Sequence, residues 1–158
     1  MDDAAPKLQS AGEAEVSLPT RLLHTGCILC ALLMAAMLAA NVGAVLTQDE
    51  LKVLLLRQWV LTPGLFLLNL LLLAVLILAK TLRPSGIRRL TRLTERLYFV
   101  LAMTVLVLLP SAVLGWMWAS RLQPVSGAVA TSSVEALAQL MVLLLMWRNA
   151  LDAARLRV

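Results

Sequence analysis

The sequence predicts an all-α integral membrane protein, folded as a bundle of four transmembrane helices. Apolar residues make up 61% of the 158 residues and charged residues only 15%, whereas soluble domains contain roughly 45–50% and about 25%. Four long apolar stretches each reach the length of about 20 residues that a membrane-crossing helix requires. Leucine runs without apolar–polar alternation favour helices over a β-barrel. The apolar content also excludes a disordered chain, and two cysteines are too few for a disulfide scaffold.

The apolar stretches place the four helices at about residues 22–46, 58–79, 98–119 and 125–147. These helices are expected to form one membrane domain, residues 20–150, followed by a short cytoplasmic tail, residues 151–158. Residues 1–19 carry four acidic side chains together with proline and glycine, which predicts a disordered cytoplasmic arm. An acidic arm before a long apolar stretch does not match a secretory signal peptide, which begins with basic residues and a short apolar region.

The distribution of basic residues predicts the orientation. With an even number of spans, both termini and the middle loop share one side of the membrane. That side carries 11 of the 14 Lys and Arg residues, and the other side carries only Lys52, Arg57 and Arg121. Because basic loops stay in the cytoplasm, we expect both termini to be cytoplasmic. Short loops and a composition rich in Ala, Leu and Arg favour a bacterial inner membrane. Aromatic residues at the predicted span ends, where such rings prefer to lie, are Trp59, Tyr98, Trp116, Trp118 and Trp147.

The loop between the second and third spans contains a basic amphipathic segment. Between residues 87 and 97, leucines recur at helical spacing among arginines, which predicts a short helix that lies on the cytoplasmic leaflet and turns into the third span. Its arginines either anchor the topology, bind anionic lipid headgroups or dock a partner. The residues concerned are Arg83, Arg88, Arg89, Arg92 and Arg96. No aromatic residues interleave with these arginines, so nucleic-acid binding is not expected.

The first span carries a stripe of sulfur-containing side chains. At 100° per residue, one narrow face of this helix holds Cys27, Cys30, Met34 and Met37. Asn41 lies on the same face, and His24 lies near its edge at the cytoplasmic end. Thiolate and thioether ligands suit a soft ion such as Cu(I), which is one interpretation. The other is packing, because Cys and Met fill gaps between helices as apolar residues. The absence of a second cysteine pair favours packing.

Three polar residues lie within the later apolar stretches. Glu135 is the only acid in such a stretch, and Gln139 follows on the same helical face. A carboxylate at membrane depth is costly and indicates a proton relay or an ion pair with a cation on a partner subunit. Alternatively, Ser132 and Glu135 form a capping box that starts the fourth helix near the interface. Asn69, in the middle of the second span, is expected to hydrogen-bond to another helix.

Small residues predict which helix is packed most closely. The first span has two ridges spaced by four residues, Ala35-Ala39-Gly43 and Ala36-Ala40-Ala44. Such ridges allow helix backbones to approach each other, so the first helix is expected to form the centre of the bundle along them. In the second span, Pro63-Gly64 predicts a kink or a late helix start near the outer end.

Two short sequence features are similar to small bacterial four-helix membrane proteins of the copper-resistance D type. They are Arg21-Leu22-Leu23-His24 at the start of the first span and Trp59-x-x-x-Pro63 at the start of the second. The resemblance covers about the first half of the chain. The glycine-rich stretch that follows the histidine in those proteins is replaced here by alanines, and no function is transferred from them.

The sequence favours a protein without catalytic activity or a cofactor. A single histidine cannot supply the ligands of a bis-histidine haem or of a di-iron cluster. The chain also lacks a phosphate-binding loop, a glycine-rich dinucleotide turn and a paired carboxylate site. We therefore expect an accessory, assembly or scaffolding subunit of a larger membrane complex, in contact with other membrane subunits or with a second copy. The alternative is a small transporter of a soft metal ion or of protons.

Overall fold

The protein is a bundle of four long helices. The computed structural model describes residues 5–82, 88–120 and 126–157. Within these ranges every regular element is helical and there is no strand. Four helical segments are long and apolar enough to span a membrane: Leu18–Leu46, Glu50–Leu82, Arg88–Trp118 and Ala128–Ala154. This confirms the predicted helical fold class and the number of membrane-competent helices.

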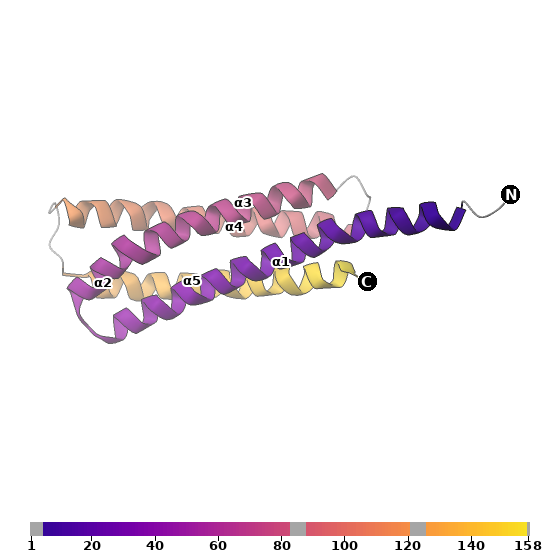
Figure 1. The fold of residues 1–158 in the computed structure, drawn as a ribbon. Coiled ribbons are helices and arrows are strands. Elements are labelled where there is room, and N and C mark those ends of the chain that lie inside the picture. The colour runs from indigo at the N-terminus through magenta and orange to yellow at the C-terminus, as the bar shows by residue number, and fades with distance from the viewer. Residues whose placement is uncertain (1–4, 83–87, 121–125, 158) are drawn as a thin grey trace.

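The helices run antiparallel in two neighbouring pairs, with α1 beside α5 and α3 beside α4 (Figure 1). Both ends of the chain lie at the same end of the bundle. The elements in chain order are α1 (Ala5–Leu46), α2 (Glu50–Leu56), η1 (Arg57–Leu61), α3 (Thr62–Leu82), α4 (Arg88–Ala119), α5 (Ala128–Ala154) and η3 (Arg155–Arg157). α1 therefore begins within the segment 1–19 for which the sequence predicts a disordered arm. The helix-forming residues Ala, Glu, Lys and Leu are frequent in that segment.

The second predicted span is one continuous helical rod that contains a wide turn. α2 leads directly into η1, a single π-helical turn, and then into α3. In this turn the backbone N–H of Thr62 donates to the carbonyl of Arg57, five residues earlier. Pro63 has no N–H to donate, and π-turns appear mostly as single turns within α-helices. The structure thus places a π-turn immediately before the proline, and the helix does not start late.

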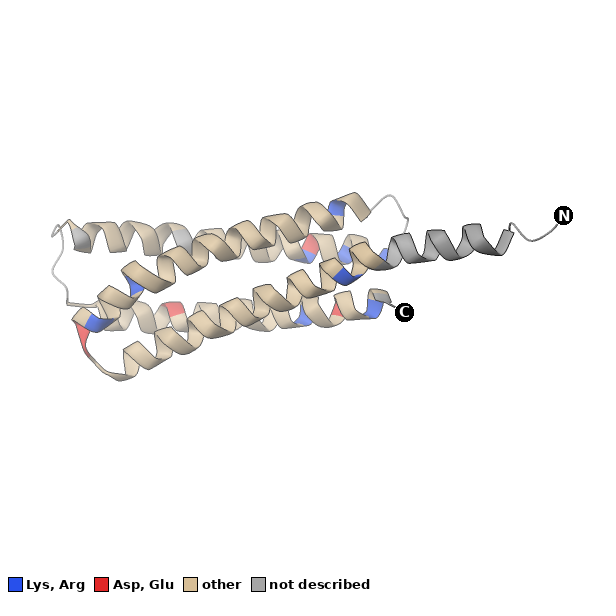
Figure 2. Cartoon of the chain, in the orientation of Figure 1, with Lys and Arg blue, Asp and Glu red and all other residues tan. Residues whose placement is uncertain are grey.

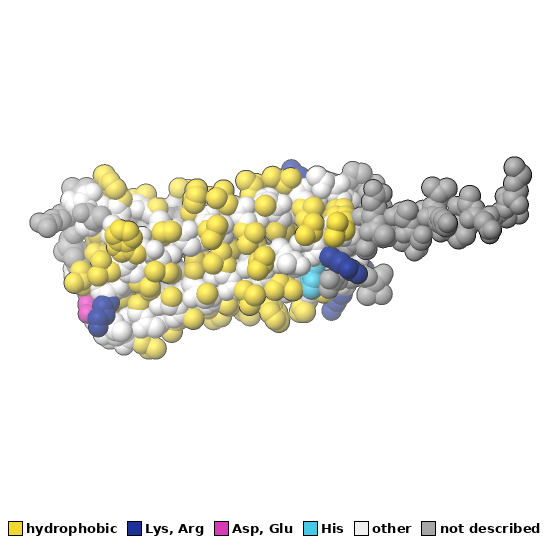
Figure 3. Space-filling model, in the orientation of Figure 1, with side chains coloured by type: hydrophobic (Ala, Val, Ile, Leu, Met, Phe, Trp, Pro, Cys, Tyr) yellow, Lys and Arg dark blue, Asp and Glu magenta, His cyan; other side chains and the backbone are white. Residues whose placement is uncertain are grey.

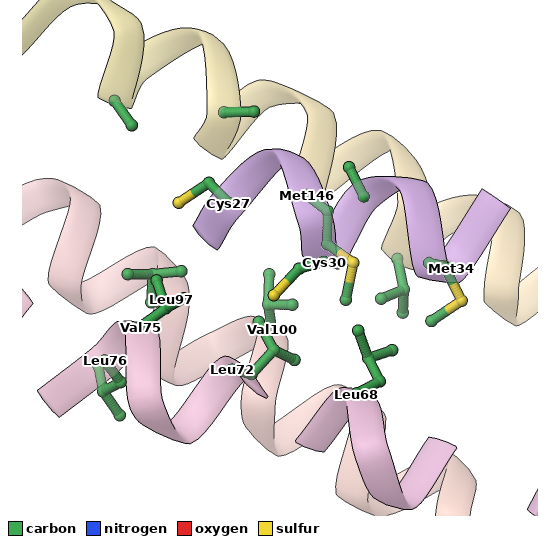
Figure 4. Close-up of a cluster of buried hydrophobic side chains, with 14 of the residues drawn as sticks. Cys27, Cys30, Met34, Leu68, Leu72, Val75, Leu76, Leu97, Val100 and Met146 are labelled. Atoms are coloured by element: carbon green, nitrogen blue, oxygen red, sulfur yellow. The ribbon is translucent and has the colours of Figure 1, made fainter. Parts of the chain in front are cut away.

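The sulfur stripe of α1, not its small-residue ridges, forms the main packed face of this helix. Cys27, Cys30 and Met34 are buried in an apolar core with side chains of α3, α4 and α5 (Figure 4). Gly43 is exposed, and no side chain or backbone atom lies within 4 Å of the position a Cβ would take there. Ala36 and Ala39 are exposed as well, whereas Ala35, Ala40 and Ala44 are partly buried. α1 packs against both α3 and α5, as expected of a central helix, but mainly through the larger side chains of the stripe.

Residues 88–97 of the basic segment form the first turns of α4 and lead into the third membrane-competent segment, as predicted, but they pack against the bundle instead of lying on its surface. Leu90, Leu93 and Leu97 are all buried in the core. Val100 and Thr104 continue the same buried face along the helix. Since this apolar stripe packs against the rest of the bundle, α4 extends beyond the predicted span at its N-terminal end.

The first turn of α5 is capped by a residue from α2. α5 begins at Ala128, four residues before Ser132. The Glu50 carboxylate accepts hydrogen bonds from the backbone N–H groups of Gly127, at 3.3 Å, and Val129, at 2.7 Å. The capping box predicted for Ser132 and Glu135 is therefore wrong. The cap comes from a residue far away in the sequence. Since α5 begins at Ala128 and not at Ser132, it is long enough to cross a bilayer.

Candidate functional site

Charged side chains gather toward the two ends of the bundle and leave its middle apolar (Figures 2 and 3). We call one end the basic end, where the chain termini lie. The helix ends that meet there carry, among others, the basic residues Arg21, Lys80, Arg88, Arg89, Arg92, Arg96, Arg148 and Arg155. We call the other the opposite end, where Lys52 is exposed and Arg57 is buried. Arg83 and Arg121 lie outside the described residues.

A buried ion pair joins η1 to α5 inside the bundle. The Arg57 Nη2 atom lies 2.5 Å from the Glu135 Oε2 atom, and the two side chains are only 1% and 7% exposed. Glu135 is the seventh residue after the start of α5, which places it about 10 Å along the helix from the opposite end. Glu135 therefore lies in the interior, and its cation comes from the same chain and not from the partner subunit that the sequence suggested.

The Arg57 guanidinium also connects three other groups. It donates to the Ser111 hydroxyl of α4 at 2.7 Å and to the Ser132 hydroxyl of α5 at 2.8 Å. Its Cζ atom lies 5.5 Å from the ring centroid of Trp118, in cation–π contact. Trp118, which was predicted at the membrane interface, is buried by this contact. One cation thus links η1, α4 and α5.

Amide side chains extend this network to α1. The Asn41 Nδ2 group donates to the backbone carbonyl of Ser132 and to Gln139 Oε1, both at 3.2 Å. Asn41 and Gln139 are fully buried. The polar cluster comprises Asn41, Arg57, Ser111, Ser132, Glu135 and Gln139. It connects all four membrane-competent segments, the second of them through Arg57 of η1. Its net formal charge is zero.

A cavity of about 530 Å³ adjoins the polar cluster between α4 and α5. Its wall is mostly apolar, and its polar lining comes from Arg57, Ser111, Thr131 and Glu135. Glu135 Oε1 and Arg57 Nε have no hydrogen-bond partner among the described residues. The cavity thus brings space for a small molecule next to a carboxylate that keeps one oxygen unbonded.

The sulfur stripe lies in the apolar core of the bundle. Cys27, Cys30, Met34 and Met37 are all buried, while His24 is half-buried near the basic end. The core around the stripe is apolar, with Leu72, Val100 and Met146 among its members (Figure 4). Within the described residues, no three His, Cys, Asp or Glu side chains gather as a metal site. Neither cysteine forms a disulfide.

The hydrogen bond predicted for Asn69 is confirmed. The Thr104 hydroxyl of α4 donates to Asn69 Oδ1 at 2.8 Å, and Asn69 Nδ2 donates to the carbonyl of Leu65 within α3. The cavity beside Glu135 does not include Asn69 in its lining. Its position indicates a role in holding α3 against α4.

Arg57 is the functional residue that sequence reasoning missed. It was assigned to the outer loop because a basic residue at the start of a span usually faces headgroups. Two signals point to it: leucines precede it directly at Leu54–Leu56, and it lies as far from its helix start as Glu135 does. An isolated acid in a span requires a cation at the same depth, and Arg57 meets that condition.

Comparisons with known proteins find no matching family model, no matching curated protein and no matching solved structure.

Proposed function

We propose that the chain is a non-catalytic subunit that supports a larger membrane complex as an accessory, assembly or scaffolding component. The proposal rests on one observation: the buried polar side chains bond to one another across helices. Arg57, Glu135 and their hydrogen-bond partners connect helices to one another, and the pair is neutral as a whole. Such use of buried polar side chains supports a role in holding the fold together.

The proposal includes a membrane orientation. The basic end faces the cytoplasm and the opposite end faces outward, in a bacterial inner membrane, because basic residues resist translocation. Burial of Arg57 removes one of the three basic residues that the sequence assigned to the outer loops. The asymmetry between the loops is therefore larger than the residue count alone indicates. Accessible-cysteine labelling of single cysteines introduced at Lys52 and at Arg88 tests this orientation in intact cells.

Small exposed residues on α1 provide a surface for a partner helix. Ala39 and Gly43 lie on the outside of the bundle, and the position of a Gly43 Cβ has no neighbour within 4 Å. In membranes, helices approach each other most closely over such residues. A second helix, from another subunit or a second copy, therefore fits this part of α1 better than it fits the leucine-rich surface of α3.

Co-purification in mild detergent tests the accessory role. We expect a stoichiometric membrane partner to be retained by the wild-type chain and lost from Gly43→Leu, which fills the surface without touching the core. Ala74→Leu is the matched control, because Ala74 is also exposed but lies on α3. A chain that runs alone as a monomer, and that supports solute flux in liposomes, contradicts the proposal.

A proton carrier is the second candidate function. The observation that favours it is the cavity beside Glu135, because a carrier needs an acid that can exchange its proton through an accessible space. Flux into liposomes with an enclosed pH-sensitive dye separates the two candidates. The accessory proposal expects no flux, whereas a flux that disappears in Glu135→Gln would establish the carrier.

The soft-metal alternative is tested by metal analysis of the purified chain. The apolar surroundings of Cys27 and Cys30 support packing as their role. We expect no stoichiometric copper or zinc, and no difference in metal content between the wild type and the Cys27→Ser and Cys30→Ser variants. Stoichiometric copper that is lost in both variants would support the soft-metal transporter instead.

A further inference from the structure

The strongest unassigned feature is a cleft at the basic end, between α4 and α5. It has a volume of about 290 Å³. Arginines of both helices line it, together with one acid, and we call it the basic cleft. Its charged residues are Arg89, Arg92, Arg96, Arg148, Asp152 and Arg155. Five guanidinium groups and one carboxylate leave a surplus of four positive charges in a small space.

The single acid neutralises only part of this charge. Asp152 forms an ion pair with Arg96 through its Oδ2 atom, and its Oδ1 atom lies 3.7 Å from Arg155 Nη1. Among the described side chains, Arg89, Arg92 and Arg148 have no carboxylate within 4.0 Å. Asp152 thus holds two arginines in place, while three others stay free to bind an anion.

Guanidinium groups favour phosphate oxygens, to which they donate paired hydrogen bonds. Several arginines that converge from two helices suit a phosphate better than a single carboxylate, because a phosphate presents more acceptor oxygens. The cleft is wide enough for a phosphate group with its glycerol. Basic pockets between transmembrane helices on the cytoplasmic side are known to bind anionic headgroups.

Aromatic residues place the cleft at the level of lipid headgroups. Trp147, next to Arg148 on α5, is 56% exposed, and Tyr98 on α4 is 42% exposed. The Tyr98 ring also lies 4.9 Å from the Lys80 ammonium, in cation–π contact. Exposed Trp and Tyr rings of this kind favour the membrane interface, where the phosphate available to the cleft belongs to a phospholipid.

We propose that the basic cleft is a specific binding site for the phosphate headgroup of an anionic phospholipid. The proposal deepens the contact with anionic lipids expected from the sequence and adds Arg148 and Arg155, from the other end of the chain. The proposed orientation decides only which leaflet supplies the lipid. The lipid proposal does not depend on the accessory role, so co-purification and lipid binding succeed or fail separately.

Native mass spectrometry of the full chain with equal amounts of phosphatidylglycerol and phosphatidylcholine tests the site. We expect one phosphatidylglycerol to be retained in preference to phosphatidylcholine. Arg92→Gln/Arg148→Gln should reduce this preference at least tenfold. The matched control is Arg21→Gln/Arg88→Gln, which removes the same charge from the same end without altering the lining of the cleft. Thermal unfolding checks that both double variants are folded. If Arg92→Gln/Arg148→Gln is not folded, the single variant Arg89→Gln takes its place.

The variant Asp152→Asn and soluble phosphate competitors provide two further tests of the site. Removal of the carboxylate should strengthen phosphatidylglycerol binding several-fold, a gain that a purely structural role of Asp152 does not produce. Glycerol phosphate and inorganic phosphate should not displace the lipid at equimolar concentration, since they lack its acyl chains. Displacement by either one assigns the cleft to a soluble phosphate and overturns the lipid. Equal losses in the two double variants, or no preference for phosphatidylglycerol, overturn the site itself.

Discussion

The polar cluster and the basic cleft place charge in opposite environments. In the polar cluster, one cation and one anion are buried together and neutralise each other. In the basic cleft, several cations surround one anion, and the Arg96 and Asp152 side chains remain 39% and 29% exposed. A charge without a partner is costly to bury, whereas a surplus at the surface is solvated by water and headgroups. The difference indicates that the cluster stabilises the fold and that the cleft is available for recognition.

The largest expected effect comes from removing one member of the buried pair. Glu135→Leu leaves the Arg57 cation buried without its counter-charge, which should lower the free energy of unfolding by about 3–5 kcal/mol. The measurement is unfolding in detergent, followed by helical circular dichroism. Glu95→Gln, which removes an exposed carboxylate on α4, is the control and should change little.

The double variant Arg57→Met/Glu135→Leu shows whether the loss comes from an unpaired charge. It removes both charges and should recover most of the stability, since apolar replacements of a buried pair are often neutral or stabilising. If the double variant is as unstable as Glu135→Leu alone, the loss of stability does not come from an unpaired buried charge.

An intermediate loss of stability is expected when Glu50, at the opposite end, is replaced. Glu50→Gln weakens the cap of α5 by removing a charge that accepts from two backbone N–H groups. Loss of a helix cap costs about 1 kcal/mol, and the same unfolding measurement should detect it. Lys52→Gln is a suitable control, because Lys52 is exposed on the same helix. A Glu50→Gln variant with wild-type stability would show that solvent caps α5 equally well.

A smaller effect is expected at the hydrogen bond between α3 and α4. Thr104→Val keeps the shape of the side chain but removes the donor to Asn69. Interhelical hydrogen bonds in membranes contribute about 0.6 kcal/mol on average, so the unfolding free energy should fall by about that amount. A loss as large as that of Glu135→Leu would mean that neutral polar bonds stabilise the bundle as strongly as the ion pair.

The smallest stability effect is expected in the basic cleft. Asp152→Asn breaks a partly exposed ion pair, and such pairs contribute about 0–1 kcal/mol. The unfolding midpoint should therefore change little, even though lipid binding changes. High salt should weaken this pair further and leave the buried pair almost unaffected. A large loss of stability in Asp152→Asn would assign the cleft to the fold instead of to recognition.

The spans could be predicted because lipid imposes a simple rule on composition and length. A stretch of about 20 apolar residues is long enough to cross a bilayer as a helix, and the described chain has four helical segments of this kind. The packing within the bundle does not follow from that rule. Small-residue spacing did not identify the main packing face of α1, because it ignores how the larger Cys and Met side chains of another face fill the gaps.

The candidate sites could be predicted only in part. Glu135 was recognised because an acid in a span is unusual, but its partner Arg57 is far away in the sequence. The pairing depends on how η1 meets α5, which no local pattern encodes. In the same way, the sequence pointed to Arg92 and Arg96 but missed Arg148 and Arg155. These four residues share a cleft only once α4 and α5 lie side by side.

The position of Arg57 early in the chain has a consequence for biogenesis. A ribosome completes α1 to α3 before it synthesises Ser111, Ser132 or Glu135, so a nascent hairpin must hold a guanidinium whose partners do not yet exist. Lipid phosphates or the insertion machinery must accommodate that cation until α5 arrives. Chains that end before α5 should consequently be recognised by membrane proteases, and a shorter half-life of such truncated chains in pulse–chase labelling would reveal this.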